Sequence, residues 1–348
     1  MLSRSLPLES TYLGHTFWQR WPISAKRGNG WVDFQGFTRS LGVSDLTSLN
    51  LELFDRKCPI CETGNAVEFA PANFDLSRLD AFAFASRKRP EFMHFRLVEC
   101  KTCDVLYANP APGHDALLKA YEGASFNTSN ESEYAAKTYC NYLKRYLSDM
   151  PDRDGALDIG TGDGAFLEQL LAASFENVAG VEPSAAPVQV AKPHIRAHIR
   201  LGPFRASDYA SEEFRVVSCF QTIEHVHDPL QLCRDALRII KPGGAFFIVC
   251  HNRRALLARV LGPKSPIFDI EHIQIFSPAS VQALLKTAGF QRVEVQPIVN
   301  CYPMSYWANL LPVPSRVKDV LSRVLTSTRA GKLTLAAPVG NLAAIAFR

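Results

Sequence analysis

The stretch Ala156-Leu157-Asp158-Ile159-Gly160-Thr161-Gly162-Asp163-Gly164 decides the fold of this 348-residue chain. Its first four residues are typical of a short buried strand with one acid, and three glycines follow within five residues. Glycine adopts positive φ angles without strain and lets the backbone approach a bound molecule closely. Residues 165–171 then have helical spacing, and residues 178–181 are a second apolar run. The sequence therefore predicts a strand, a glycine loop, a helix and a second strand.

Glu182 ends the second apolar run, 22 residues after Gly160. An acid at the tip of this strand is placed to accept hydrogen bonds from the ribose hydroxyls of an adenosine cofactor. The glycine spacing is G-x-G-x-G, whereas a dinucleotide site has G-x-G-x-x-G. With Asp158 two residues upstream, the loop resembles motif I of class I S-adenosylmethionine (SAM)-dependent methyltransferases. An NAD-dependent oxidoreductase and a glycine-rich turn without a ligand are the alternatives.

The resemblance implies a set of cofactor contacts. Asp158 and the glycine backbone would hold the amino-acid end of SAM, and Glu182 would hold its ribose. Relatives often keep an acid after the third strand for the adenine amino group. Here Gly202-Pro203-Phe204 occupies that place, which leaves backbone groups, stacking on Phe204, or Asp208. The expected cofactor-binding residues are Asp158, Gly160, Thr161, Gly162, Gly164, Glu182, Pro183, Phe204, Gln221 and Thr222.

Four of the nine cysteines form two C-x-x-C pairs, Cys58 with Cys61 and Cys100 with Cys103. Two such pairs can supply four thiolates to one tetrahedral Zn²⁺, which leaves no open coordination position and makes the site structural. Unligated structural thiols and a redox pair are the alternatives. The 38 residues between the pairs exceed the usual ribbon spacing, so the segment from Phe74 to Phe95 is expected to loop out.

The second cysteine pair extends the resemblance. Cys100-x-x-Cys103-x-x-x-Tyr107-x-Asn109-Pro110, just before the glycine loop, is similar to bacterial methyltransferases with an N-terminal zinc ribbon. Some relatives of that group methylate deoxysugar nucleotides on carbon. In this family, helices before the first strand commonly roof the SAM pocket. Four tyrosines occur on the predicted helices of residues 115–150, and we expect them to pack in the core: Tyr134, Tyr139, Tyr142 and Tyr146.

The reacting groups are expected after the fourth strand, residues 215–220. Open α/β sheets bind ligands at the carboxyl ends of their strands, and Glu224-His225 follows this strand. The segment resembles the E-x-x-E-H pattern of ubiquinone-pathway O-methyltransferases, but Gln221 replaces the first Glu, so a divalent metal is not expected here. His225 is the predicted general base, with Glu224 orienting it or facing the sulfonium; a structural loop is the alternative. His272 is a rival base or substrate ligand.

Basic residues follow the fifth predicted strand, residues 245–250. Solvent exposure is the first interpretation for these side chains, and a clamp on a substrate phosphate is the second. They are Arg253, Arg254, Arg259 and Lys264. Farther on, an apolar stripe at helical spacing predicts packing on the body of the protein or on a second subunit, so a homodimer is one expected arrangement. A membrane-surface role is the alternative. The residues of this stripe are Val317, Val320, Leu321, Val324 and Leu325.

The pattern as a whole predicts an α/β fold, a doubly wound sheet of seven strands with a small zinc-binding module. The expected divisions are an unassigned extension, a zinc-ribbon-like module, a helical cap and the methyltransferase domain, at residues 1–55, 56–112, 113–150 and 151–348. A formal net charge of +4 makes nucleic acid an unlikely partner. No leader or run of 18 apolar residues is present, so we expect a cytoplasmic protein without a membrane span.

The predicted activity is methyl transfer from SAM to a small metabolite or carbohydrate, such as a nucleotide-linked sugar. Two alternatives keep SAM. In one, the ribbon grips RNA for an RNA methyltransferase, and in the other the chain is a non-catalytic SAM-binding partner.

Overall fold

The computed structural model describes residues 24–27, 30–33, 52–73, 75, 83–84, 91–124, 126, 131–310, 315–328, 331 and 333–348. Most of the predicted N-terminal extension, and most of the segment expected to loop out between Phe74 and Phe95, lie outside the described residues. Within the extension, a short antiparallel pair is described, β1 (Ser24–Arg27) with β2 (Gly30–Asp33).

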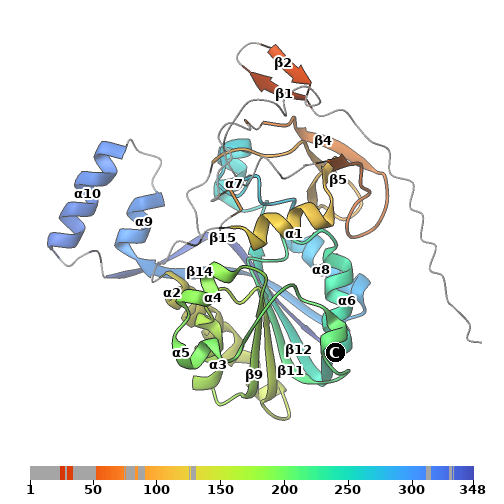
Figure 1. Ribbon diagram of the computed structural model, residues 1–348, viewed down its shortest axis with the longest axis vertical. Helices are drawn as coiled ribbons and strands as arrows, with labels where there is room; N and C mark the ends of the chain where they lie inside the picture. The colour runs from red at the N-terminus through yellow and green to blue at the C-terminus, as the bar shows by residue number, and fades with distance from the viewer. Residues whose placement is uncertain are drawn as a thin grey trace, which may run out of the picture.

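A seven-stranded sheet forms the body of the protein, in the order β10-β9-β8-β11-β12-β15-β14 (Figure 1). β15 is antiparallel to both of its neighbours, whereas the other pairs in the sheet are parallel. The predicted doubly wound sheet of seven strands is therefore confirmed. The strands are β8 (Asp154–Ile159), β9 (Glu176–Glu182), β10 (Ile199–Leu201), β11 (Phe214–Phe220), β12 (Ile240–His251), β14 (Arg292–Pro303) and β15 (Thr334–Phe347).

Helices cover both faces of this sheet. Alternate residues of β12 point to opposite faces, because side chains alternate along a strand. Phe246 and Ile248 pack in the core under α6 (Pro229–Ile239) and α8 (Pro278–Ala288). Phe247 and Val249 pack in the core under α2 (Glu131–Leu143) and α3 (Ala165–Ala172), which includes Tyr139 and Tyr142. The predicted core position of those two tyrosines is thus confirmed.

Local sequence signals fix several helix ends. Asp228 accepts a hydrogen bond from the backbone N–H of Gln231 at 2.9 Å, and Pro229 begins α6. Ser277 caps α8 in the same way, and Gly289 ends that helix at φ 112°. The remaining helices are α1 (His114–Glu122), α4 (Ala185–Val190), α5 (Pro193–Arg196), α7 (Leu256–Leu261), α9 (Met304–Leu310) and α10 (Ser315–Ser327), with short 3₁₀ turns at Lys144–Asp149, Ala206–Asp208 and Gly262–Lys264.

A second sheet carries the cysteine pairs, in the order β13-β6-β5-β4. Three of its strands come from the region before residue 112, but β13 comes from the loop that precedes α8 and pairs antiparallel with β6. The cysteine region therefore shares a sheet with a segment that lies more than 160 residues later in the chain. The strands are β4 (Ala66–Ala70), β5 (Leu97–Cys100), β6 (Leu106–Ala108) and β13 (Gln274–Ile275); β3 (Leu53–Phe54) pairs with β7 (Ala111–Pro112).

Two expectations differ from the structure. β12 begins at Ile240 and not at the predicted Ala245, because Ile240 already pairs with Phe214. The pairing register then shifts across Lys241-Pro242-Gly243-Gly244, so that Val216 pairs with Ala245. In the predicted apolar stripe of α10, Leu325 is buried, whereas Val317, Val320 and Val324 are each at least 50% exposed. Among the described residues, no helix is both long and apolar enough to cross a bilayer.

Candidate active site

The glycine loop lies between β8 and α3, at the carboxyl edge of the parallel strands (Figure 1). The backbone N–H groups of Gly160 and Thr161 both donate to the carbonyl oxygen of Val181, at 2.9 and 3.1 Å. Gly160 has φ 74°, and a Cβ there would lie 2.3 Å from Oγ1 of Thr222. Gly162, at φ 59°, has no described heavy atom within 4 Å of its Cβ position. The loop is thus closed against β9 and β11 but open at Gly162.

Glu182 ends β9 beside this open position. Its two carboxylate oxygens accept hydrogen bonds from the backbone N–H groups of Gly162 and Ser184, each at 2.9 Å. A carboxylate has about four acceptor positions, so two such bonds orient the group and leave capacity for further donors. Pro183 follows directly and is half-buried. The arrangement suits a ligand with two adjacent hydroxyl groups.

Asp158 is buried at the end of β8. Its Oδ1 accepts a hydrogen bond from Ser218 Oγ at 2.6 Å. Burial raises the pKa of Asp158 to about 7, although the hydrogen bond from the Ser218 hydroxyl favours the charged form. A cationic group bound nearby would stabilise the carboxylate, so the site fits the ammonium of an amino acid.

Gln221 follows β11 and contributes unpaired polar atoms. Its φ is 49°, a left-handed conformation that costs a non-glycine residue energy. Both its side-chain oxygen and its side-chain nitrogen are buried, with no hydrogen-bond partner among the described residues. Buried amide atoms without partners cost free energy, so a polar ligand that pairs with them would stabilise this conformation. Thr222, next in the chain, packs against Gly160.

The predicted adenine contacts have partners within the protein. The Phe204 ring stacks on Tyr209, with ring centroids 5.9 Å apart. Asp208 forms an ion pair with Arg200 at 2.8 Å. Of these two predicted adenine contacts, Phe204 is the one whose aromatic ring could stack on a purine.

Three histidines lie together beyond Gln221, where the loop after β11 meets the segment before β13. The ring centroid of His272 lies 4.9 Å from those of both His225 and His251. His225 is half-buried, and its Nδ1 lies 2.8 Å from the hydroxyl of Tyr121. The structure thus brings the two candidate bases, His225 and His272, into contact with each other.

Glu224 is fully buried beside this cluster. One carboxyl oxygen accepts a hydrogen bond from the backbone N–H of His251 at 2.6 Å, and the other has no hydrogen-bond partner among the described residues. Burial raises the pKa of Glu224 to about 7. The carboxyl group therefore points to β12, and its contact is with the backbone of that strand.

Three residues of this site carried no signal in our sequence analysis: Tyr121, His251 and Gln274. Gln274 is fully buried, and its amide donates to the carbonyl oxygens of Ile223 and Val226, at 2.8 and 2.6 Å. It therefore fixes the loop that carries Glu224 and His225. Its position in β13 could not be read from the sequence, since β13 has only two residues.

The four paired cysteines form one cluster, with their sulfur atoms all within 4.8 Å of one another. Sγ of Cys58 lies 3.4 Å from that of Cys103, and Sγ of Cys61 lies 3.5 Å from that of Cys100. A hydrogen bond from Cys103 lowers the pKa of Cys58 to about 5, so the cluster favours a thiolate. Four sulfur atoms at this spacing fit a tetrahedral metal ion such as Zn²⁺.

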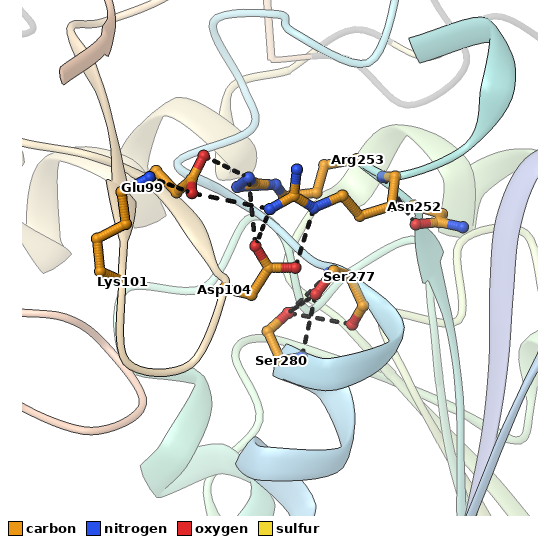
Figure 2. A network of polar contacts seen from close by, with 8 residues as sticks. Glu99, Lys101, Asp104, Asn252, Arg253, Ser277 and Ser280 are labelled. Carbon is orange, nitrogen blue, oxygen red and sulfur yellow. Dashed lines mark hydrogen bonds and ion pairs between the residues drawn. The ribbon is translucent and has the colours of Figure 1, made fainter. Parts of the chain in front are cut away.

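Arg253, two residues after His251, reaches toward acids of the cysteine region (Figure 2). Its side chain is 3% exposed and pairs with Glu99 at 2.7 Å and with Asp104 at 3.4 Å, the residues that flank Cys100 and Cys103. Arg254 also pairs with Asp104. The expectation of solvated charges or a phosphate clamp is wrong for Arg253, because the acids of the cysteine region neutralise it.

A glycine loop, an acid at the tip of the next strand and the strand order found here define a Rossmann-like fold of the class I methyltransferase type. The comparisons with known proteins agree. Residues 132–295 match the model of a methyltransferase domain family.

Curated relatives match the same region. A ubiquinone biosynthesis O-methyltransferase of Thiobacillus denitrificans is 30% identical over 152 residues, which cover 40% of this chain and 65% of the relative. Another, from Pseudomonas aeruginosa, is 36% identical over 114 residues, 30% of this chain and 49% of the relative. The chain thus spans less than two thirds of each relative.

The chain was also compared with solved structures. A SAM-dependent methyltransferase of Archaeoglobus fulgidus is 18% identical, with a TM-score of 0.43, over 63% of this chain and 97% of that protein.

Proposed function

We propose that this protein transfers a methyl group from SAM to a small-molecule or carbohydrate acceptor. The observation that carries the proposal is the set of groups at the carboxyl edge of β8, β9 and β11. The open backbone at Gly162, the oriented Glu182 carboxylate and the unpaired Gln221 amide lie at the ends of adjacent strands. Together with the methyltransferase domain match, they support SAM as the ligand.

Different residues of this edge would bind different parts of the cofactor. Asp158 and the backbone of the glycine loop would face the charged amino acid, Glu182 the ribose and Phe204 the adenine. When bound, SAM supplies a methyl group that its positively charged sulfur makes electrophilic. The protein must then align the acceptor behind that methyl group and exclude water, and alignment contributes up to ~7–11 kcal/mol in model systems.

The acceptor in this proposal is a small molecule with an ionisable hydroxyl group. The relatives named O-methyltransferase support this class, and the low net charge of +4 disfavours a nucleic acid. A general base such as His225 would contribute ~10²–10⁴-fold in rate. We assign the base to the histidine cluster beside the cofactor edge.

We further propose that the four cysteines hold one structural Zn²⁺. Elemental analysis of the purified protein should give one zinc per chain. A Cys58→Ser, Cys103→Ser double variant should lose the zinc, while Cys140→Ser, which alters a buried thiol outside the cluster, should retain it. Equal zinc content in all three proteins would contradict the proposal.

The cofactor is tested by calorimetry with SAM and with its demethylated product. Binding of both, and no binding of NAD, is the expected result. The acceptor is then sought by incubating labelled SAM with fractionated metabolites and identifying by mass what gains a methyl group. A folded protein that binds neither SAM nor its product would overturn the proposed function.

A further inference from the structure

The His225 ring is held through Nδ1 by two neighbours. Nδ1 lies 3.1 Å from the backbone carbonyl oxygen of Glu271 and 2.8 Å from the hydroxyl of Tyr121. The Tyr121 hydroxyl also donates to the Glu271 carbonyl, at 2.9 Å. The three polar atoms therefore form a triangle in which one member, the carbonyl oxygen, can only accept.

This triangle selects one tautomer of the neutral imidazole. If Nδ1 carries the hydrogen, it donates to Glu271 or Tyr121, and the phenol hydrogen goes to the same carbonyl, which has two lone pairs. If Nδ1 carries the lone pair, two acceptors face each other at 3.1 Å, and the single phenol hydrogen cannot serve both. The first arrangement satisfies every donor, so Nδ1 is protonated and Nε2 bears the lone pair.

His272 is held differently. Its Nδ1 lies 2.9 Å from the carbonyl oxygen of Ile267, and its Nε2 lies 3.7 Å from a carboxylate oxygen of Glu271. The ring is 6% exposed and packs between His225 and His251. Both nitrogens of His272 thus face the protein, whereas His225 is the more exposed ring of the pair.

Tyr121 comes from α1, before the matched methyltransferase domain, and lies 104 residues from His225 in the sequence. Its ring also packs edge-on against Phe84, with centroids 5.6 Å apart. Burial raises the pKa of Tyr121 well above its ordinary value, so the phenol stays protonated and remains a donor. The residue touches the candidate base from the side opposite the atom that would react.

We propose that Tyr121 is a positioning residue that, with the Glu271 carbonyl, holds His225 in the Nδ1–H tautomer so that Nε2 accepts the proton of the methyl acceptor. The inference rests on the proposed function. In the reaction, the acceptor O–H gives its proton to Nε2, and the oxygen electron pair forms a bond to the methyl carbon. The carbon–sulfur bond breaks, its pair stays on sulfur, and the sulfonium becomes a neutral thioether. His225 leaves the step as an imidazolium whose Nδ1–H still has acceptors.

Nitrogen NMR of the full chain tests the tautomer without any substrate. With ¹⁵N-labelled histidine at pH 8.5, two-bond proton–nitrogen correlations distinguish a protonated from an unprotonated ring nitrogen, and the signals missing in His225→Gln assign the residue. The wild-type protein should show His225 with protonated Nδ1 and unprotonated Nε2. In Tyr121→Phe, the signals should move toward a mixture of tautomers.

Tyr142→Phe is the matched control, because its hydroxyl also bonds to a backbone carbonyl, that of Pro297, away from the histidines. This variant should leave the His225 signals unchanged. A wild-type His225 protonated at Nε2, or His225 signals that are the same in folded Tyr121→Phe and wild type, would overturn the proposal. If the wild-type protein does not bind SAM, the proposed function is rejected instead. The failure of the tautomer proposal and the failure of the proposed function are therefore distinguishable. With an acceptor in hand, Tyr121→Phe should lower kcat by less than the ~10²–10⁴-fold lost with the base, at unchanged KM for SAM.

Discussion

The cofactor edge and the histidine cluster lie side by side but are built in different ways. The first is made by backbone groups and two acids between residues 158 and 184, with Gln221 and Thr222 beside them. The second joins side chains from residues 121, 225, 251 and 272, which meet only through tertiary packing. The difference teaches that a local backbone motif can be read from a sequence, whereas the geometry of a reacting group depends on segments far apart in it.

Gly160→Ala tests the cofactor edge and should have the largest effect. The new Cβ would meet Thr222 at 2.3 Å in a left-handed conformation. Strain of ~1–2 kcal/mol and overpacking of ~1–3 kcal/mol should lower the free energy of unfolding, measured by urea denaturation, and SAM binding should fall ~100-fold or more.

Gly162→Ala is the control for that change. Gly162 has a similar φ but open space at its Cβ position, so only the strain of ~1–2 kcal/mol should appear in unfolding. Equal losses of stability in the two variants would show that contact with Thr222 does not shape the loop.

Glu224→Gln tests the surroundings of the histidine cluster. The pKa of Glu224 is raised to about 7, so the folded protein binds the proton more tightly than the unfolded chain does. The free energy of unfolding should therefore fall as pH rises from about 4.5 to about 7, and the loss should be complete above pH 7. In the variant, the side-chain oxygen of Gln would still accept the hydrogen bond from the backbone N–H of His251.

Glu224→Gln should accordingly be more stable than wild type at pH 8, by roughly 3 to 3.5 kcal/mol, and close to wild type at pH 4.5. Urea denaturation at the two pH values measures the difference. A variant less stable than wild type at pH 8 would mean that the carboxylate is stabilised by contacts of its own.

Arg253→Met tests the junction between the cysteine region and the histidine cluster. Removal of this guanidinium should cost about 2 kcal/mol of unfolding free energy. This is less than the ~3–5 kcal/mol for breaking a fully buried pair, because Lys101 and Arg254 still neutralise Glu99 and Asp104. The proposed zinc ion should also be lost faster to a chelator.

Arg292→Met removes an exposed pair with Asp149 and should cost only ~0–1 kcal/mol. Similar losses of unfolding free energy in the two arginine variants would show that Arg253 stabilises the protein no more than an exposed ion pair does.

Sequence reasoning predicted the seven-stranded sheet and the cysteine cluster because each strand and each C-x-x-C pair is a local pattern, and a known architecture joins such patterns. It also placed Glu182 beside the glycine loop, since strand, loop and helix lengths fix that distance. Tyr121 could not be found, because its contact with His225 depends on how α1 packs across more than 100 residues. Arg253 looked like a surface charge for the same reason: its acidic partners are about 150 residues away.

The two residues of β13 limit how this protein can be shortened. Gln274 and Ile275 add a strand to the cysteine sheet, and Gln274 also braces the turn that bears His225. A fragment starting at residue 131 would keep the complete cofactor loop but leave β13 without its neighbour β6. A shortened form of this chain should therefore retain residues 52–124 as well, because they include the strand that pairs with β13.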